Sequence, residues 1–187
     1  MMDAIVSLYT HSNGRIARKT WWLGVLGLIV ASLVVSIILG VFGLGLNMGR
    51  PAFDPANTDM AAVTEAAAAA MRASAWGSLI NFAILAYPAY NLMVKRRHDR
   101  DNSGRDVAVY LAVTGLLLIV QALGLGTTMV DFGGGAMMPM PSMALSTALA
   151  ALGIFGIYLL VVCGFLRGTP GSNHYGADPL DGVAATA

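Results

Sequence analysis

The chain has 187 residues, of which 57% are hydrophobic and 11% are charged. Because soluble domains carry about twice this share of charged residues, the composition excludes an ordinary water-soluble fold and predicts a membrane protein. The formal net charge of +1 argues against a nucleic-acid partner, but the basic residues cluster between apolar blocks, so their positions are more informative than their sum.

Four uncharged stretches follow one another along the chain, at residues 21–46, 75–94, 107–130 and 144–166. Each is about as long as the roughly 20 residues that a helix needs to cross the hydrocarbon of a bilayer. The first is too long for the apolar part of a cleaved signal peptide, so we expect it to remain as an anchor. The sequence therefore predicts an all-α, polytopic membrane protein: one membrane domain over residues 1–187, a four-transmembrane-helix bundle with an irregular cytoplasmic cap.

A basic segment, His11 to Trp22, precedes and enters the first stretch. If this segment is helical, its basic residues share a face with a tryptophan, because residues three and four apart are neighbours on a helix. The residues concerned are Arg15, Arg18, Lys19 and Trp22. Such a helix would lie at the membrane surface, with tryptophan at headgroup depth and the bases toward anionic lipid.

The alanine-rich segment from Asp59 to Ser74 is helical by propensity. We expect it to extend the second helix beyond the membrane or to lie on the membrane surface, with Asp59 as its N-terminal cap.

A second basic segment, residues 95–106, joins the second and third stretches, and Asn102-Ser103-Gly104 supplies residues typical of a tight turn. Two interpretations stay open. The arginines could form a phosphate or headgroup site, because the planar guanidinium binds phosphate oxygens in pairs. Alternatively, the charges only fix the orientation in the membrane, with the aspartates balancing nearby arginines; this simpler interpretation is favoured.

The connection from Asp131 to Met143 is rich in glycine, proline and methionine, so we expect an irregular loop. Met129, just before this connection, falls together with four methionines within it: Met137, Met138, Met140 and Met143. Thioethers select Cu(I), but methionine is also a flexible apolar filler, and this loop has no histidine or cysteine. The only cysteine, Cys163, lies in an apolar stretch and is expected to pack as a small hydrophobic group. We therefore predict no metal site and no cofactor.

The segment from Arg167 to Pro179 carries so many glycines and prolines that the fourth helix must end before it. Its polar run, residues 173–176, is expected to pack back onto the bundle.

The basic residues divide unequally between the two sides of the predicted bundle. One side has Arg15, Arg18, Lys19, Lys95, Arg96, Arg97, Arg100, Arg105 and Arg167, and the other has Arg50 and Arg72. Since lysine and arginine are retained on the cytoplasmic side, both termini and the central loop are expected in the cytoplasm.

Three motifs, GRIARKTWW (14–22), KRRHDRDNSG (95–104) and GSNHYGADP (171–179), occur in this order on the same predicted side. Together they resemble the signature motifs of the bacterial inner-membrane family called domain of unknown function 805, over most of the chain. The resemblance implies a multi-pass protein of the bacterial inner (plasma) membrane. It lends no activity, because the family's function is unknown.

We expect a non-enzymatic membrane component whose basic cap binds anionic lipid, a small anion or a protein partner. The candidate ligand-binding residues are Arg15, Arg18, Lys19, Arg96, His98, Asp99, Ser103, Asn173, Tyr175 and Asp178. The bilayer, and through the basic residues its anionic headgroups, is the expected partner.

Two alternatives use the same segments. An interfacial enzyme would employ His98 as acid or base with Asp99 as its orienter, and His174 or Asp178 reaching over from the tail; a metal variant would use the same four residues. Neighbours in a chain often point apart, so we expect no enzyme. A transporter or channel would need a homo-oligomer, because no predicted span contains an ionisable residue that could line a path.

Overall fold

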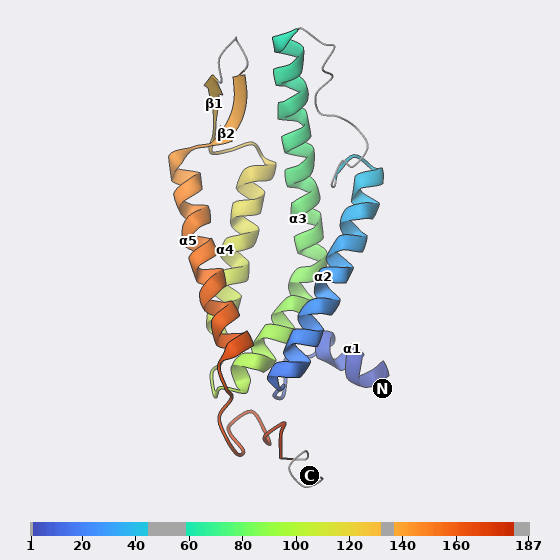
Figure 1. Ribbon diagram of the computed structural model, residues 1–187, viewed down its shortest axis with the longest axis vertical. Coiled ribbons are helices and arrows are strands. Elements are labelled where there is room, and N and C mark those ends of the chain that lie inside the picture. Colours follow the sequence, from blue (N-terminus) through green and yellow to red (C-terminus); the bar gives the residue numbers. More distant parts are fainter. Residues whose placement is uncertain (1, 45–58, 132–136, 182–187) are drawn as a thin grey trace. The chain divides into compact units, whose positions relative to one another are not determined.

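The computed structural model describes residues 2–44, 59–131 and 137–181. Within these ranges the chain forms five α-helices and one small antiparallel hairpin (Figure 1). In chain order they are α1 (Met2–Thr10), α2 (Arg18–Val41), α3 (Met60–His98), α4 (Arg105–Ala122), β1 (Thr127–Asp131), β2 (Met137–Pro141) and α5 (Met143–Leu160). A π-helical turn (Val161–Phe165) continues α5. The predicted all-α class is confirmed.

Four of these helices are long and apolar enough to cross a membrane, over Arg18–Val41, Ala61–His98, Arg105–Ala122 and Met143–Phe165. Large apolar side chains stand exposed along them, as Leu23, Leu26 and Ile29 do on α2. Lipid is a favourable surrounding for such surfaces, and a helix satisfies its own backbone there. The chain is a multi-pass membrane protein, as predicted.

The helix ends differ from the predicted spans because absence of charge was the only criterion for those spans. Helix α2 ends at Val41 and α4 at Ala122, whereas the predicted stretches run to residues 46 and 130. Soon after each end stands a glycine in the left-handed conformation, Gly43 (φ 78°) and Gly124 (φ 70°), which terminates a helix. Residues 45 and 46 lie outside the described part of the chain.

The prediction of an irregular loop from Asp131 to Met143 is wrong for residues 137–141, which form β2. This strand pairs with β1, so that Thr128 faces Met140 and Val130 faces Met138. Alternation along a strand places Met138 and Met140 on one face of the hairpin and Met129 and Met137 on the other. The methionines of this candidate copper site therefore do not converge on one face.

Helix α3 confirms the predicted extension of the second span. Asp59 caps its start, since the Asp59 carboxylate accepts the backbone N–H of Ala61 at 3.0 Å. The helix then runs for 39 residues to His98. At 1.5 Å per residue this is about 58 Å, well beyond the thickness of the hydrocarbon layer.

The fold consists of two compact units, and every long helix contributes to both. Unit 1 comprises Met1–Ser32, Ile84–Val113 and Gly153–Ala187, and unit 2 comprises Leu33–Ala83 and Thr114–Leu152. Within unit 2, Asn81 of α3 donates a hydrogen bond to the Ser36 hydroxyl of α2 at 3.1 Å. Unit 1 contains all three motifs.

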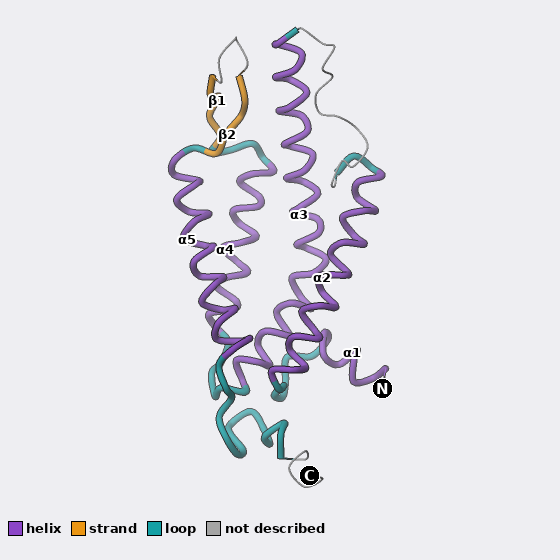
Figure 2. Tube along the Cα trace, viewed as in Figure 1, coloured by secondary structure: helices purple, strands orange, loops and turns teal. Residues whose placement is uncertain are grey.

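Two buried apolar clusters form the core of unit 1. They consist of Trp21, Leu92 and Cys163, and of Val94, Val107 and Leu159. Cys163 is buried among apolar side chains, as predicted. The charged segment 95–104 follows Val94 directly. Packing of Val94 in the core therefore fixes the position of the backbone at the start of this segment. In Figure 2 the tail, residues 166–181, is drawn as loop throughout.

Candidate functional site

The three motif segments meet in unit 1, where they form a polar cap: residues 11–20, 95–106 and 167–181. Arg15 contacts Asp99 from the second segment and Thr169 from the third. The Asn173 amide donates to the backbone carbonyl of His98 at 2.9 Å. Asn173 thus packs back onto the end of α3, as expected for the polar run of residues 173–176. The separate surface helix expected for residues 11–22 is not formed: residues 11–17 are not helical, and Arg18 already belongs to the membrane-crossing helix α2.

Helix α1, which was not predicted from the sequence, is held against α3 in the same unit. Three α3 side chains spaced four residues apart donate to its last carbonyls: Tyr87 to Thr10, Asn91 to Tyr9 and Lys95 to Ser7. The last carbonyls of a helix have no hydrogen-bond donor within the helix, so the three α3 side chains provide donors for these carbonyls of α1. The Tyr9 hydroxyl donates a hydrogen bond to the Gly24 carbonyl at 2.9 Å, and burial raises the pKa of this hydroxyl.

A buried ion-pair cluster of Arg15, Arg96 and Asp99 lies at the centre of the cap. The Asp99 Oδ1 atom is 3.0 Å from Arg15 Nη2, and its Oδ2 atom pairs with Arg96 Nη1. The three side chains are 1%, 0% and 5% exposed, respectively. Buried charges are stable only when they are paired and hydrogen-bonded. The cluster therefore holds the segment before α2 against the end of α3.

All three nitrogens of the Arg15 guanidinium have partners inside the protein. Nε donates to Asp99, with which Nη2 also forms an ion pair. Nη1 and Nη2 donate to three carbonyls of the tail: Thr169 at 2.7 Å, Gly171 at 2.6 Å and Gly176 at 3.2 Å. The Arg15 side chain, which is 1% exposed, therefore secures the tail and is closed to a ligand.

The π-helical turn at the end of α5 presents four consecutive carbonyls to side chains from α2 and α3. Arg96 donates to Cys163 and Leu166, Trp22 donates to Gly164, and Arg18 donates to Phe165. The end of a helix carries partial negative charge and unpaired carbonyls, so cationic donors are favourable here. This arrangement places Arg18 and Arg96 beside the start of the tail.

The tail passes so close to Asp99 that only glycine fits at position 168. A Cβ atom at Gly168 would overlap the carboxylate of Asp99. The next residue, Thr169, donates its backbone N–H to the Asp99 carbonyl at 2.8 Å. Gly168 and Thr169 were not among the predicted site residues; their only signal in the sequence is their position directly after Arg167.

His98 and its neighbour Asp99 point to different partners. Nδ1 of His98 is 3.2 Å from the Gly14 carbonyl, which can only accept, so Nδ1 carries a proton. The ring stacks on Tyr175, with 3.8 Å between centroids and 8° between planes. His174 instead pairs with Asp101 and is 87% exposed. The acid–base pair and the shared ligand set of the enzymatic alternative are not brought together.

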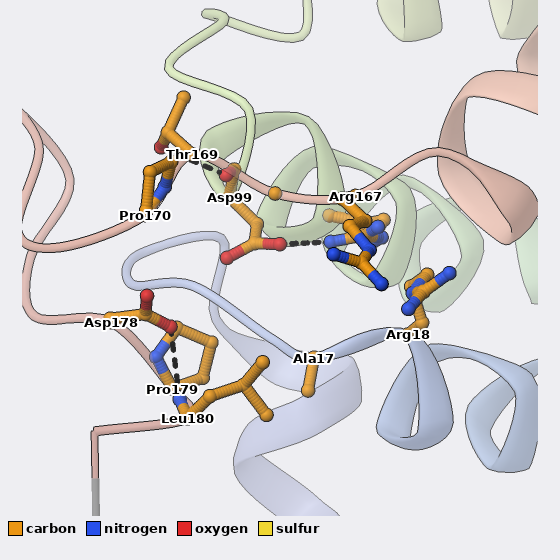
Figure 3. Close-up of a pocket in the computed structure, with 11 residues that line it drawn as sticks. Ala17, Arg18, Asp99, Arg167, Thr169, Pro170, Asp178, Pro179 and Leu180 are labelled. Atoms are coloured by element: carbon orange, nitrogen blue, oxygen red, sulfur yellow. Dashed lines mark hydrogen bonds and ion pairs between the residues drawn. The ribbon is translucent and has the colours of Figure 1, made fainter.

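A pocket of about 350 Å³ opens between the start of α2, the end of α3 and the tail (Figure 3). Its charged lining consists of Arg18, Arg96, Arg167, Asp99 and Asp178. Both carboxylate oxygens of Asp178 accept backbone N–H groups, from Gly171 and Leu180. Within the part of the chain that the structure describes, no three histidine, cysteine or acidic side chains are grouped to hold a metal ion.

The predicted site residues divide into three groups. Arg15, Arg96, His98, Asp99, Asn173 and Tyr175 come together and bind one another. Arg18 and Asp178 line the pocket, and Lys19 lines a neighbouring one. Ser103 is exposed and lines neither. Sequence reasoning omitted Arg167, whose signal was a lone charge at the end of the last span.

No curated protein and no solved structure matches the chain. The family model described as "Protein of unknown function (DUF805)" matches residues 9–177. The matched region contains the first two motifs and the third as far as Ala177, and with them the Arg15–Arg96–Asp99 cluster. The chain belongs to the DUF805 family.

Proposed function

We propose that this protein is a non-enzymatic component of a bacterial inner membrane whose polar cap, on the cytoplasmic side, binds a phosphate-bearing anion in the Arg18–Arg167 pocket. One observation supports the proposal: the arginines of the buried cluster are bound to groups within the protein, whereas those at the pocket have guanidinium donors available for a ligand. Arg15 is 1% exposed and all three of its guanidinium nitrogens have partners within the protein, whereas Arg18 uses one guanidinium nitrogen, at Phe165.

Arg167 is the other available cation. Its side chain is exposed at the pocket and has no partner among the described residues. Two guanidinium groups that face one cavity are suited to phosphate, because each planar fork can donate two parallel hydrogen bonds to its oxygens. Three arginines against two aspartates leave the lining with a net positive charge.

The buried cluster supports the pocket without taking part in binding. Arg15 and Arg96 are buried and both pair with Asp99, so the guanidinium groups that remain available to a ligand are those of Arg18 and Arg167. Because the cluster fixes the tail, it also fixes the backbone that carries Arg167. The charged residues of the cap therefore divide into those that hold the tail and those that are available to a ligand.

Orientation supports an anionic ligand as well. Nine of the eleven basic residues belong to segments on the cap side, which is the distribution expected of a cytoplasmic face. The cytoplasmic leaflet is negatively charged and attracts basic residues by about 1 kcal/mol each near its surface. Headgroup phosphates and soluble phosphate compounds are both present there.

The proposal is tested by titrating inorganic phosphate into the detergent-purified protein and following binding by calorimetry. Arg18→Gln and Arg167→Gln should each weaken binding, and the double variant should abolish it. Arg72→Gln is the matched control, because Arg72 is an exposed arginine of unit 2 that lines a different pocket. Equal phosphate binding by the double variant and the wild type would refute the proposal.

A further inference from the structure

The pocket carries an uncompensated negative charge as well as positive ones. Asp178 accepts two backbone hydrogen bonds, at 3.1 Å from Gly171 and 3.0 Å from Leu180, and no cationic side chain of the described residues pairs with it. Each carboxylate oxygen has two lone pairs, so both can accept another donor. A purely anionic ligand would leave this charge unmatched.

The two kinds of charge are separated across the pocket. In Figure 3, Asp178 lies on one side of the cavity, whereas Arg18 and Arg167 lie on the other. Asp99, which also lines the cavity, is already neutralised by two arginines. A complementary ligand therefore has a phosphate toward the arginines and a cationic hydrogen-bond donor toward Asp178.

A second pocket connects this site to the apolar surface of α2. It has a volume of about 390 Å³, shares Ala17, Arg18 and Leu180 with the first pocket, and is also lined by Lys19 and Trp22. Trp22 is 40% exposed, and tryptophan side chains in membrane proteins gather at headgroup depth.

The exposed apolar residues Leu26 and Ile29 continue the Trp22 face of α2, because they follow it by one and two helical turns. This face belongs to unit 1, as the pocket does. An acyl chain that leaves the second pocket at Trp22 therefore contacts apolar side chains along α2. A soluble ligand without an acyl chain would not make these contacts, so they would not strengthen its binding.

We infer that the pocket binds a glycerophospholipid whose headgroup carries a primary ammonium beside its phosphate. The phosphate lies at Arg18 and Arg167, the ammonium donates to Asp178, and the acyl chains follow the Trp22 face of α2. A glycerol headgroup brings no positive charge to Asp178, and a quaternary choline brings charge without an N–H donor. The inference rests on the proposed phosphate site and names its ligand.

The test compares three probes on the purified protein by native mass spectrometry: dioctanoyl phosphatidylethanolamine, dioctanoyl phosphatidylglycerol and water-soluble phosphoethanolamine. The wild type should retain the ethanolamine lipid about tenfold more tightly than the glycerol lipid, the ratio that one charged hydrogen bond supplies. Phosphoethanolamine should bind more weakly than the lipid. Asp178→Asn should reduce the lipid ratio to about one, whereas Arg72→Gln should leave it unchanged.

The outcomes separate this inference from the proposed function. Equal retention of the two lipids by a wild type that binds phosphate through Arg18 and Arg167 would overturn the inference alone. Phosphoethanolamine binding as tight as that of the lipid would overturn its lipid part. The wild-type comparison needs no variant, so it decides the matter even if Asp178→Asn does not fold. Failure of the proposed function would be seen in a different experiment, the titration with inorganic phosphate, as equal binding by the wild type and the Arg18→Gln/Arg167→Gln variant.

Discussion

Replacing Asp99 by asparagine tests the most consequential contact of the cap. The substitution keeps the size of the side chain and removes its charge, so Arg15 and Arg96 lose the carboxylate that they share. Both arginines are almost fully buried and have no other acidic partner among the described residues. We expect the folded protein to be strongly destabilised.

The magnitude follows from the burial of the two arginines. Removing one partner of a buried ion pair costs about 3–5 kcal/mol, because the charge that remains is uncompensated. Arg15 keeps its bonds to Thr169, Gly171 and Gly176, which favours the lower end, about 3 kcal/mol. In a chain of this size such a loss lowers the unfolding midpoint by roughly 6–12 °C.

The assay is thermal unfolding in detergent, followed by tryptophan fluorescence. Asp101→Asn serves as the control, because Asp101 pairs with the exposed His174 and should leave the midpoint unchanged. Adding Arg15→Gln to Asp99→Asn should lower the midpoint by less than the sum of the two single effects, since the residues share one interaction. An Asp99→Asn protein as stable as the wild type would refute the argument that the cluster holds the cap together.

Three further predictions follow from single contacts. Gly168→Ala should destabilise the protein by about 1–3 kcal/mol, because its Cβ would overlap the carboxylate of the cluster, whereas Gly153→Ala, which meets open space, should not; the same unfolding assay compares them. Tyr175→Ala should lose the stack on the histidine ring, about 0.5–1.5 kcal/mol, and Tyr175→Phe should retain it; an equal loss for both would contradict this reasoning. Single cysteines at the exposed positions Ser103 and Thr128 should react with a membrane-impermeant thiol reagent from opposite sides, the first only from the cytoplasm; labelling of both from one side would contradict the proposed orientation.

The spans and the cap were predictable to different degrees. Four uncharged stretches were enough to predict four membrane-crossing helices, because a span needs only length and apolar character. Their ends were less predictable. Helix α4 stops at Ala122, and residues 127–130 pair with β2, because a left-handed glycine and a partner strand outweigh a lack of charge.

The candidate site shows the same division. The motifs identified Arg15, Arg96 and Asp99 as a set, and the structure joins them. The assignment of Arg15 as a ligand-binding residue does not fit the structure, since all three nitrogens of its buried guanidinium already have partners within the protein. Arg167 was omitted from the predicted set although it faces the pocket. Composition cannot show which of several arginines is already paired.

The sequence by itself determined that this chain is a multi-pass membrane protein and that its charged segments lie at the ends of its helices, because both properties depend only on the order of apolar and charged residues. Tertiary structure alone decided which charges neutralise one another, since pairing between residues 15, 96 and 99 depends on how the helix ends and the tail pack in space. Burial excludes water from those charges, so they pair with one another and with backbone carbonyls of the tail and of the end of α5. The arginines and the aspartate that remain at the pocket are then the groups available to a ligand.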